Sequence, residues 1–247
     1  MKLTVLALFP ELLEAYFSSS IMARAVSKGL IEYELVNIRD YATDRHRTCD
    51  DAPYGGGYGM VLKPEPLAAA LDAVSARRKH VVYASPAGRL FDQGVARELA
   101  QKDDLVFICG RYEGIDQRII DRYVHDEISV GDYVLSSGEV ATLTMIDAAY
   151  RLIDGVIASG SLVEESHEDF LLEYPHYTRP EVFQGQAVPE ILRSGNHAAI
   201  QAWRRKKRVE RTATVRPDLI SRASLSDIER EYVTEVVGGQ DGSDKGD

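Results

Sequence analysis

Three short segments combine small and polar residues where apolar, strand-like runs give way to helix-like runs. They are YASPAG at 83–88, CGRYEG at 109–114 and VLSSGE at 134–139. Small residues let backbone amides and carbonyls approach a ligand closely, and the carboxyl ends of parallel strands meet at one edge of a sheet. Together the three segments predict a single ligand crevice, although each taken singly also fits an ordinary strand-to-helix turn.

The residue types in these turns narrow the class of ligand. Neither the GxGxxG fingerprint nor a P-loop occurs, which disfavours a dinucleotide or a nucleoside triphosphate. Backbone groups can still read an adenine edge, and a carboxylate such as Glu113 suits a ligand that carries positive charge. The pattern alone therefore predicts a crevice for a small ligand and stops short of a reaction.

Other residues that could bind a metal or take part in catalysis form weaker motifs. His80, His125, His167 and His176 lack the spacing of metal ligands, and no Ser-His-Asp order with a nucleophile elbow is present. The acidic stretch EESHED at 164–169 fits either a metal-binding loop or an exposed acidic turn.

Charge and composition limit the classes of protein to which the chain can belong. The chain has 247 residues and a net charge of −10, yet residues 203–216 hold seven basic residues against one acidic residue. Such a local patch, rather than net charge, sets affinity for phosphates; a solvated helix face is the alternative explanation. A shorter basic cluster is RHR at 45–47. Because no run of eighteen apolar residues occurs and Cys49 and Cys109 form no framework, we expect a reduced cytoplasmic protein without a membrane span.

The elements that must position the turns alternate along the chain. Apolar runs predict strands at 2–9, 31–38, 79–86 and 104–110, with a further short strand after 126, and periodic segments predict helices at 10–17, 21–30, 67–74, 92–101 and 115–123 and before Gly155. This order is typical of an α/β protein with a parallel sheet. The glycine-rich stretch 39–66 shows no periodicity and is expected to be functional or mobile. After Gly155 the chain becomes acidic and then helical, with Asn196 as an expected helix N-cap.

Several motifs in one order carry a resemblance to a known family. They are ARAVSKGL, RDYATDRHRTCDDAPYGGGYGM, SPAGRLFDQ, CGRYEGIDQRI, ISVGDYVLSSGE, MIDAAYRLIDGV, LLEYPHYTRPEVFQGQAVPEIL and SGNHAAIQAWR. They span nearly the whole chain, which resembles the bacterial tRNA (guanine-N1-)-methyltransferase family, TrmD type.

The resemblance implies a fold and an assembly. It implies a SPOUT-class α/β fold with a parallel sheet, a deep trefoil knot in the C-terminal part of the N-terminal domain, and a small α-helical C-terminal domain. The expected parts are a knotted methyltransferase domain at 1–158, a linker with the catalytic acid at 159–172, a helical tRNA-binding domain at 173–238 and a disordered tail at 239–247. The family works as a homodimer with active sites at the subunit interface.

The resemblance also implies a reaction and its cofactors. A methyl group passes from S-adenosylmethionine to N1 of the guanosine at tRNA position 37, next to the anticodon, a modification that maintains the reading frame; Mg²⁺ is required. The cofactor positions map onto Tyr83, Ser85, Pro86, Gly110, Tyr112, Glu113, Gly114, Ser129, Val130, Gly131, Tyr133, Leu135 and Gly138, with Glu113 expected to face the ribose. Ser137 and Ala141 depart from the usual Gly and Pro, and Ser137 should be tolerated if its φ is not positive.

The catalytic acid also departs from the family pattern. The family has Asp before a Ser in the acidic linker, and this chain has Glu165 before Ser166, with Asp169 as the rival if the gap is placed elsewhere. A general base must reach the proton on guanine N1, which Glu165 can do with its longer arm. Arg151 matches the family's arginine that stabilises the negative charge developing on guanine O6. The residue pattern alone would instead favour an ion pair on a helix surface.

Contacts with tRNA are expected from Asp50, Ser166, His176, Arg179 and the basic run near Trp203. Two other classes stay open at this point. The first is an RNA-binding module without catalysis, which remains an alternative because Glu165 stands where the family has Asp. A nicotinamide oxidoreductase on a Rossmann sheet is a poor fit, since the glycine fingerprint and its following acidic residue are absent.

Overall fold

The computed structural model describes residues 1–157, 166–167 and 169–240, without the side chains of 237–240. The chain divides into two compact units, 1–159 and 160–247, which are described separately. Within the described ranges, no helix has the length and apolar character needed to cross a membrane.

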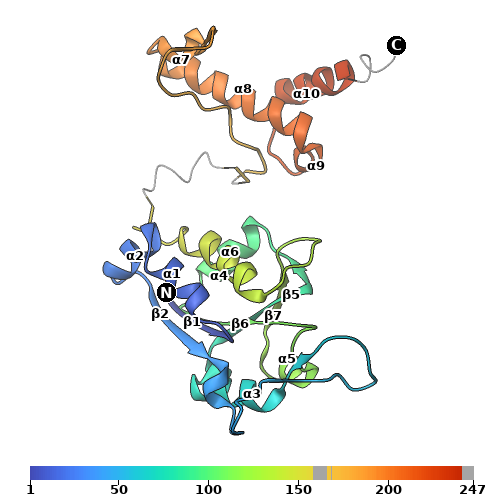
Figure 1. The fold of residues 1–247 in the computed structure, drawn as a ribbon. Coiled ribbons are helices and arrows are strands. Elements are labelled where there is room, and N and C mark those ends of the chain that lie inside the picture. Colours follow the sequence, from blue (N-terminus) through green and yellow to red (C-terminus); the bar gives the residue numbers. More distant parts are fainter. Residues whose placement is uncertain (158–165, 168, 241–247) are drawn as a thin grey trace. The chain divides into compact units, whose positions relative to one another are not determined.

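The first unit is built on a five-stranded sheet in the order β2-β1-β6-β5-β7 (Figure 1). All neighbouring strands pair in parallel. The strands are β1 (Lys2–Ala7), β2 (Glu32–Asn37), β5 (His80–Leu90), β6 (Asp104–Cys109) and β7 (Asp126–Ser129). The predicted α/β class with a parallel sheet is confirmed.

The two faces of the sheet bury two separate cores, because side chains alternate along a strand. In β6, Leu105 and Phe107 belong to one core, and Val106 and Ile108 belong to the other. The first core is covered by α1 (Glu11–Phe17), α2 (Ser20–Ser27), α4 (Gln93–Ala100) and α6 (Gly138–Tyr150), and the second by α3 (Pro64–Ala73) and α5 (Gln117–Tyr123). All these helices were predicted from periodicity, and Met145, Ile146, Ala149 and Tyr150 of α6 pack in the first core.

Strand β5 differs from the sequence prediction. The segment AGRL was expected to be a turn, but β5 continues through it to Leu90 after a register shift between Ala84 and Arg89. Gly88 makes this possible, since a Cβ there would lie 2.4 Å from the backbone of Glu127. A tertiary contact with β7 therefore overrides the local turn propensity.

The stretch 39–66 holds more structure than its lack of periodicity indicates. It contains most of a 3₁₀ turn, η1 (Ile38–Tyr41), and a hairpin of β3 (Asp50–Asp51) with β4 (Val61–Leu62). A second 3₁₀ turn, η2 (Ala76–Arg78), precedes β5. Between β3 and β4, residues 52–60 form the glycine-rich loop.

The second unit consists mainly of helices. They are α7 (Glu190–Arg193), α8 (His197–Val215), α9 (Pro217–Ile220) and α10 (Asp227–Gln240), with a short hairpin of β8 (Val182–Phe183) and β9 (Gln186–Ala187). The predicted cap is confirmed, because the Asn196 side chain accepts a hydrogen bond from the Ala199 amide. The tail expected from 239 overlaps the last two residues of α10, and 241–247 lie outside the described residues.

Candidate cofactor and active site

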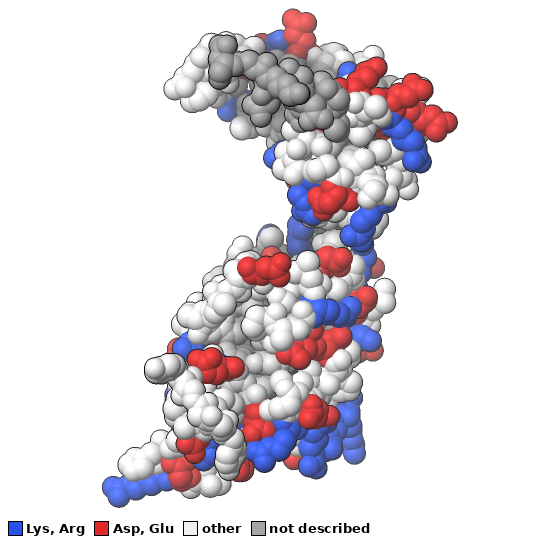
Figure 2. Space-filling model, turned by 90° about the vertical axis from the view of Figure 1, so that its right-hand side faces the viewer, with Lys and Arg blue, Asp and Glu red and all other residues white. Residues whose placement is uncertain are grey.

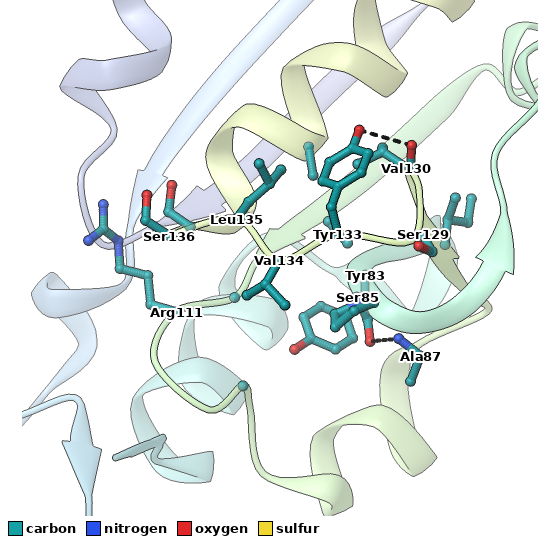
Figure 3. A pocket seen from close by; sticks show the side chains of 18 of the residues that line it. Tyr83, Ser85, Ala87, Arg111, Ser129, Val130, Tyr133, Val134, Leu135 and Ser136 are labelled. Atoms are coloured by element: carbon teal, nitrogen blue, oxygen red, sulfur yellow. Dashed lines mark hydrogen bonds between the residues drawn. The ribbon is translucent and has the colours of Figure 1, made fainter. Parts of the chain in front are cut away.

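A cavity of about 270 Å³ opens where β5 shifts register after Ala84 and beyond the carboxyl ends of β6 and β7 (Figure 3). All three turns predicted from the sequence contribute to it, which places the crevice where parallel-sheet proteins bind ligands. All thirteen residues that the family resemblance assigns to the cofactor line this cavity. The sequence reasoning did not single out its remaining lining residues Ala84, Ala87, Arg111, Ile128, Val134 and Ser136, and it named Ser137 and Ala141 only as departures.

One wall of the cavity depends on glycines that leave no room for a side chain. A Cβ on Gly138 would lie 2.6 Å from the amide nitrogen of Gly110, and the Gly138 amide donates to the Gly110 carbonyl at 2.8 Å. A Cβ on Gly110 would lie 2.9 Å from the Tyr83 ring and hydroxyl. Backbone atoms of β6 and α6 therefore line the cavity directly.

Tyr83 packs beneath this wall. Its side chain is buried, and burial, assisted by the charge of Glu127, raises its pKa to about 12. It is neutral at ordinary pH and serves as an uncharged surface against Gly110 and Gly114.

The segment after β7 forms the opposite wall through local hydrogen bonds. The Ser129 hydroxyl donates to the Gly131 carbonyl at 3.1 Å, and the Tyr133 hydroxyl donates to the Val130 carbonyl at 3.1 Å. Gly131 has a φ of +152°, which favours glycine. Figure 3 shows Tyr133 folded back toward Val130.

The two departures from the family pattern near the cofactor positions, Ser137 and Ala141, both lie in the cavity lining. Ser137 has a φ of −163°, an extended conformation open to any residue, so the condition set for it from the sequence is met. Ala141 is buried in the first turn of α6.

A buried charge pair supports the cavity from behind. Glu139 is 1% exposed, and its Oε1 lies 3.6 Å from Nε of Arg111. The Arg111 guanidinium also stacks 4.4 Å from the Phe9 ring, and Figure 3 shows it pointing away from Tyr83. Both carboxylate oxygens of Glu139 lack a hydrogen-bond partner within the described residues. The sequence gives little signal for this pair, because a glutamate in the first turn of a helix usually faces solvent.

Comparison with known proteins identifies the family. The family model described as tRNA (Guanine-1)-methyltransferase TrmD matches residues 1–222. The chain belongs to this family.

Named relatives are similar in sequence to this chain along nearly its full length. The tRNA (guanine-N(1)-)-methyltransferase of Treponema denticola is 62% identical over 223 residues, which cover 90% of this chain and 92% of that protein. Proteins of the same name from Geobacter metallireducens and Borreliella burgdorferi are 52% and 51% identical, each over at least 97% of this chain and 99% of the relative.

The residues expected to catalyse methyl transfer in this TrmD family member are only partly described. Glu165 lies outside the described residues. Arg151 directly follows α6 and is half-buried. Asp169 accepts hydrogen bonds from Arg205 and Arg208 of α8, at 3.0 and 3.2 Å to its Oδ2. These contacts occupy the carboxylate inside the second unit.

The residues expected to contact tRNA are spread over both units. Asp50 pairs across the hairpin with Leu62, whose amide bonds to the Gly114 carbonyl in the cavity wall at 3.0 Å. In the second unit, the Ser166 hydroxyl accepts from the Glu173 amide, exposed His176 lies 3.8 Å from the Glu173 carboxylate, and Arg179 lines a shallow hollow with Arg193.

The basic residues of α8 make contacts inside the second unit that a solvated helix face would lack. Arg208 is buried, Arg205 also pairs with Glu229, and Lys207 pairs with Glu210. Cation–π contacts join Arg204 to Tyr174 and Lys206 to Tyr232. Much of this charge therefore holds α8 against neighbouring segments.

Metal ligands do not gather in the described part of the chain. No group of three His, Cys, Asp or Glu residues there has a metal-binding arrangement. The described cavity lining offers Glu113 as its one carboxylate apart from Glu139 behind it, whereas Mg²⁺ usually takes one or two carboxylates plus substrate oxygens.

Proposed function

We propose that this protein transfers a methyl group from S-adenosylmethionine to N1 of the guanosine at position 37 of tRNA. The observation that carries the proposal is the glycine-walled cavity, lined by all thirteen residues that the family resemblance assigns to this cofactor. Membership of the family and relatives named tRNA (guanine-N(1)-)-methyltransferase support the reaction class.

The cavity wall suits an adenosine. The close approach of Gly110 and Gly138 puts backbone atoms instead of side chains along this wall, and backbone groups can read the edge of an adenine without a phosphate-binding loop. Glu113 lies at the same wall and offers acceptors for ribose hydroxyls. S-adenosylmethionine supplies an activated methyl group on a sulfonium, whose positive charge suits a cavity that holds the Glu113 carboxylate.

Glu165 is assigned the role of general base, and Arg151 is assigned the stabilisation of the charge that forms. Glu165 accepts the proton from guanine N1, and Arg151 stabilises the negative charge that develops on O6. Both assignments rest on the family pattern. The ion pairs of Asp169 with Arg205 and Arg208 favour Glu165 over Asp169 as the base.

The finer features of the family are part of the same proposal. They are the trefoil knot around the cofactor, a homodimer with shared active sites, a cytoplasmic location, a helical tRNA-binding domain and dependence on Mg²⁺, for which no ligand set is assigned. The convergence of the 83–88, 109–114 and 134–139 segments on one cavity supports the knot, and exposed Tyr133, Val134 and Leu135 at the mouth offer apolar area to a partner subunit.

Methyl incorporation into two tRNA transcripts tests the proposal. A transcript with guanosine at position 37 should be methylated, and one with adenosine there should not. The competing function is an RNA-binding module without catalysis, which the presence of Glu165 in place of the family's Asp keeps open. That module would bind both transcripts and methylate neither.

A further inference from the structure

The glycine-rich loop at residues 52–60 carries two tyrosines that pack against nothing in the first unit. Tyr54 is 101% exposed and Tyr58 is 99% exposed, more than any other large apolar side chain described. Exposing two aromatic rings in full gives up the stabilisation that their burial would provide. Such rings are expected to have a partner outside this unit.

The glycines between the tyrosines hold the loop away from the body of the domain. Gly55, Gly56 and Gly57 have positive φ values of 87°, 79° and 126°, and nothing lies within 4 Å of a Cβ built on any of them. Figure 1 shows the loop as a long excursion beyond α3 and α5. The backbone shape thus requires glycine for its dihedral angles and not for close packing.

The base of the loop is fixed to the cofactor cavity. The Glu113 amide donates to the Met60 carbonyl at 3.0 Å, and the Leu62 amide donates to the Gly114 carbonyl at 3.0 Å. A Cβ on Gly59 would lie 2.4 Å from Oε1 of Glu113. The tyrosines therefore extend from the rim of the cavity that the proposed function assigns to the methyl donor.

An exposed cation beside the loop suits an anionic partner. The Asp116 amide donates to the Leu62 carbonyl at the end of the hairpin, and the Arg118 side chain, which pairs with Asp116 at 2.7 Å, is 72% exposed. Figure 2 shows Lys and Arg side chains over the lower part of this unit, with carboxylates among them. Nucleic acid combines phosphates for such cations with base faces for aromatic rings.

We propose that Tyr54 and Tyr58 stack on bases of the substrate RNA beside the target guanosine. The proposal rests on the proposed function, which brings an RNA loop to the cavity rim. Single-stranded RNA loops present unstacked bases that aromatic side chains recognise by stacking. The two tyrosines thus hold the nucleotides that flank the methylated base, and the glycines let the loop adapt to them.

Equilibrium binding of an unmodified tRNA transcript with guanosine at position 37 tests this role. Tyr54→Ala and Tyr58→Ala should each weaken tRNA binding by about 5- to 150-fold, the range expected for loss of one base–aromatic stack. Tyr→Phe at either position keeps the ring and should bind like the wild type. Tyr→Leu keeps apolar area without an aromatic face and should behave like the alanine variant.

Three further readouts separate stacking from other roles. Affinity for S-adenosylmethionine and the oligomeric state should be unchanged in the alanine variants, and the dependence of tRNA affinity on salt should keep its slope, since stacking releases no counterions. Alanine variants that bind tRNA normally, or that lose cofactor binding or change oligomeric state, would overturn the stacking role. A wild-type protein that neither binds nor methylates tRNA would instead refute the proposed function.

Discussion

Arg208 and Asp169 form an ion pair that ties helix α8 to the segment before it. The Arg208 side chain is 7% exposed, and its Nη1 lies 3.2 Å from Oδ2 of Asp169. Its Nε also donates to the Leu172 carbonyl at 3.3 Å. A carboxylate held in this way is a structural anchor rather than a free base.

Replacing Asp169 with Asn should destabilise the second unit and spare the chemistry. Loss of the carboxylate leaves buried Arg208 incompletely paired, which costs about 1–3 kcal/mol of unfolding free energy. Thermal unfolding should show this loss, while kcat of the folded variant stays near that of the wild type. A stable Asp169→Asn variant without methyl transfer would instead identify Asp169 as the general base.

Acid should weaken the second unit through Glu229. Hydrogen bonding to Arg205 lowers its pKa from 4.5 to about 2, so the folded state favours the carboxylate. The stabilisation is present above pH 4.5 and is lost as the pH falls toward 2. Chemical unfolding at pH 6 and pH 3 should show a smaller difference in Glu229→Gln than in the wild type. Equal differences in both would contradict the assignment.

Adding a methyl group at Gly138 should close the cofactor cavity. The new Cβ would meet the Gly110 backbone at 2.6 Å and push α6 away from the end of β6, an overpacking that costs about 1–3 kcal/mol of stability and distorts the cavity wall, so that cofactor affinity should fall by at least about 5-fold. Calorimetry with S-adenosylmethionine measures the loss in Gly138→Ala. Gly94→Ala in α4 is the matched control, because its Cβ meets only the side chain of Asp92 within 4 Å. Unchanged affinity in Gly138→Ala would place the cofactor elsewhere.

Replacing Glu165 with Gln should remove the general base and leave cofactor binding nearly intact. Methyl transfer should fall by about 10²- to 10⁴-fold, the usual contribution of a positioned base. Glu165→Asp restores the residue type expected from the family and is the control that should keep substantial activity. Single-turnover rates with saturating tRNA and S-adenosylmethionine measure the chemistry, and a near-normal rate in Glu165→Gln would refute this role.

Local patterns in the sequence were sufficient for the helices and strands of the sheet and for the position of the crevice. Alternating burial in β6 and the periodic face of α6 are properties of neighbouring residues, and residues of all three small-residue segments line the cavity. The ligand of the crevice came from the family resemblance and not from these patterns.

Long-range contacts account for what the sequence patterns missed. The extension of β5 depends on the approach of Gly88 to Glu127, and the pairing of Arg111 with Glu139 depends on how α6 docks against the end of β6. The internal role of the basic run in α8 depends on Asp169 and Glu229, which are 36 and 24 residues from Arg205. None of these partners can be found by composition or periodicity.

The most direct test of the central claim is the identity of the methylated nucleoside. The protein is incubated with S-adenosylmethionine carrying an isotopically labelled methyl group and with an unmodified tRNA transcript, which is then digested and analysed by mass spectrometry. Labelled 1-methylguanosine is expected, at up to one per tRNA and absent when position 37 is adenosine. Label in another nucleoside, or none in a tRNA that the protein binds, would contradict it.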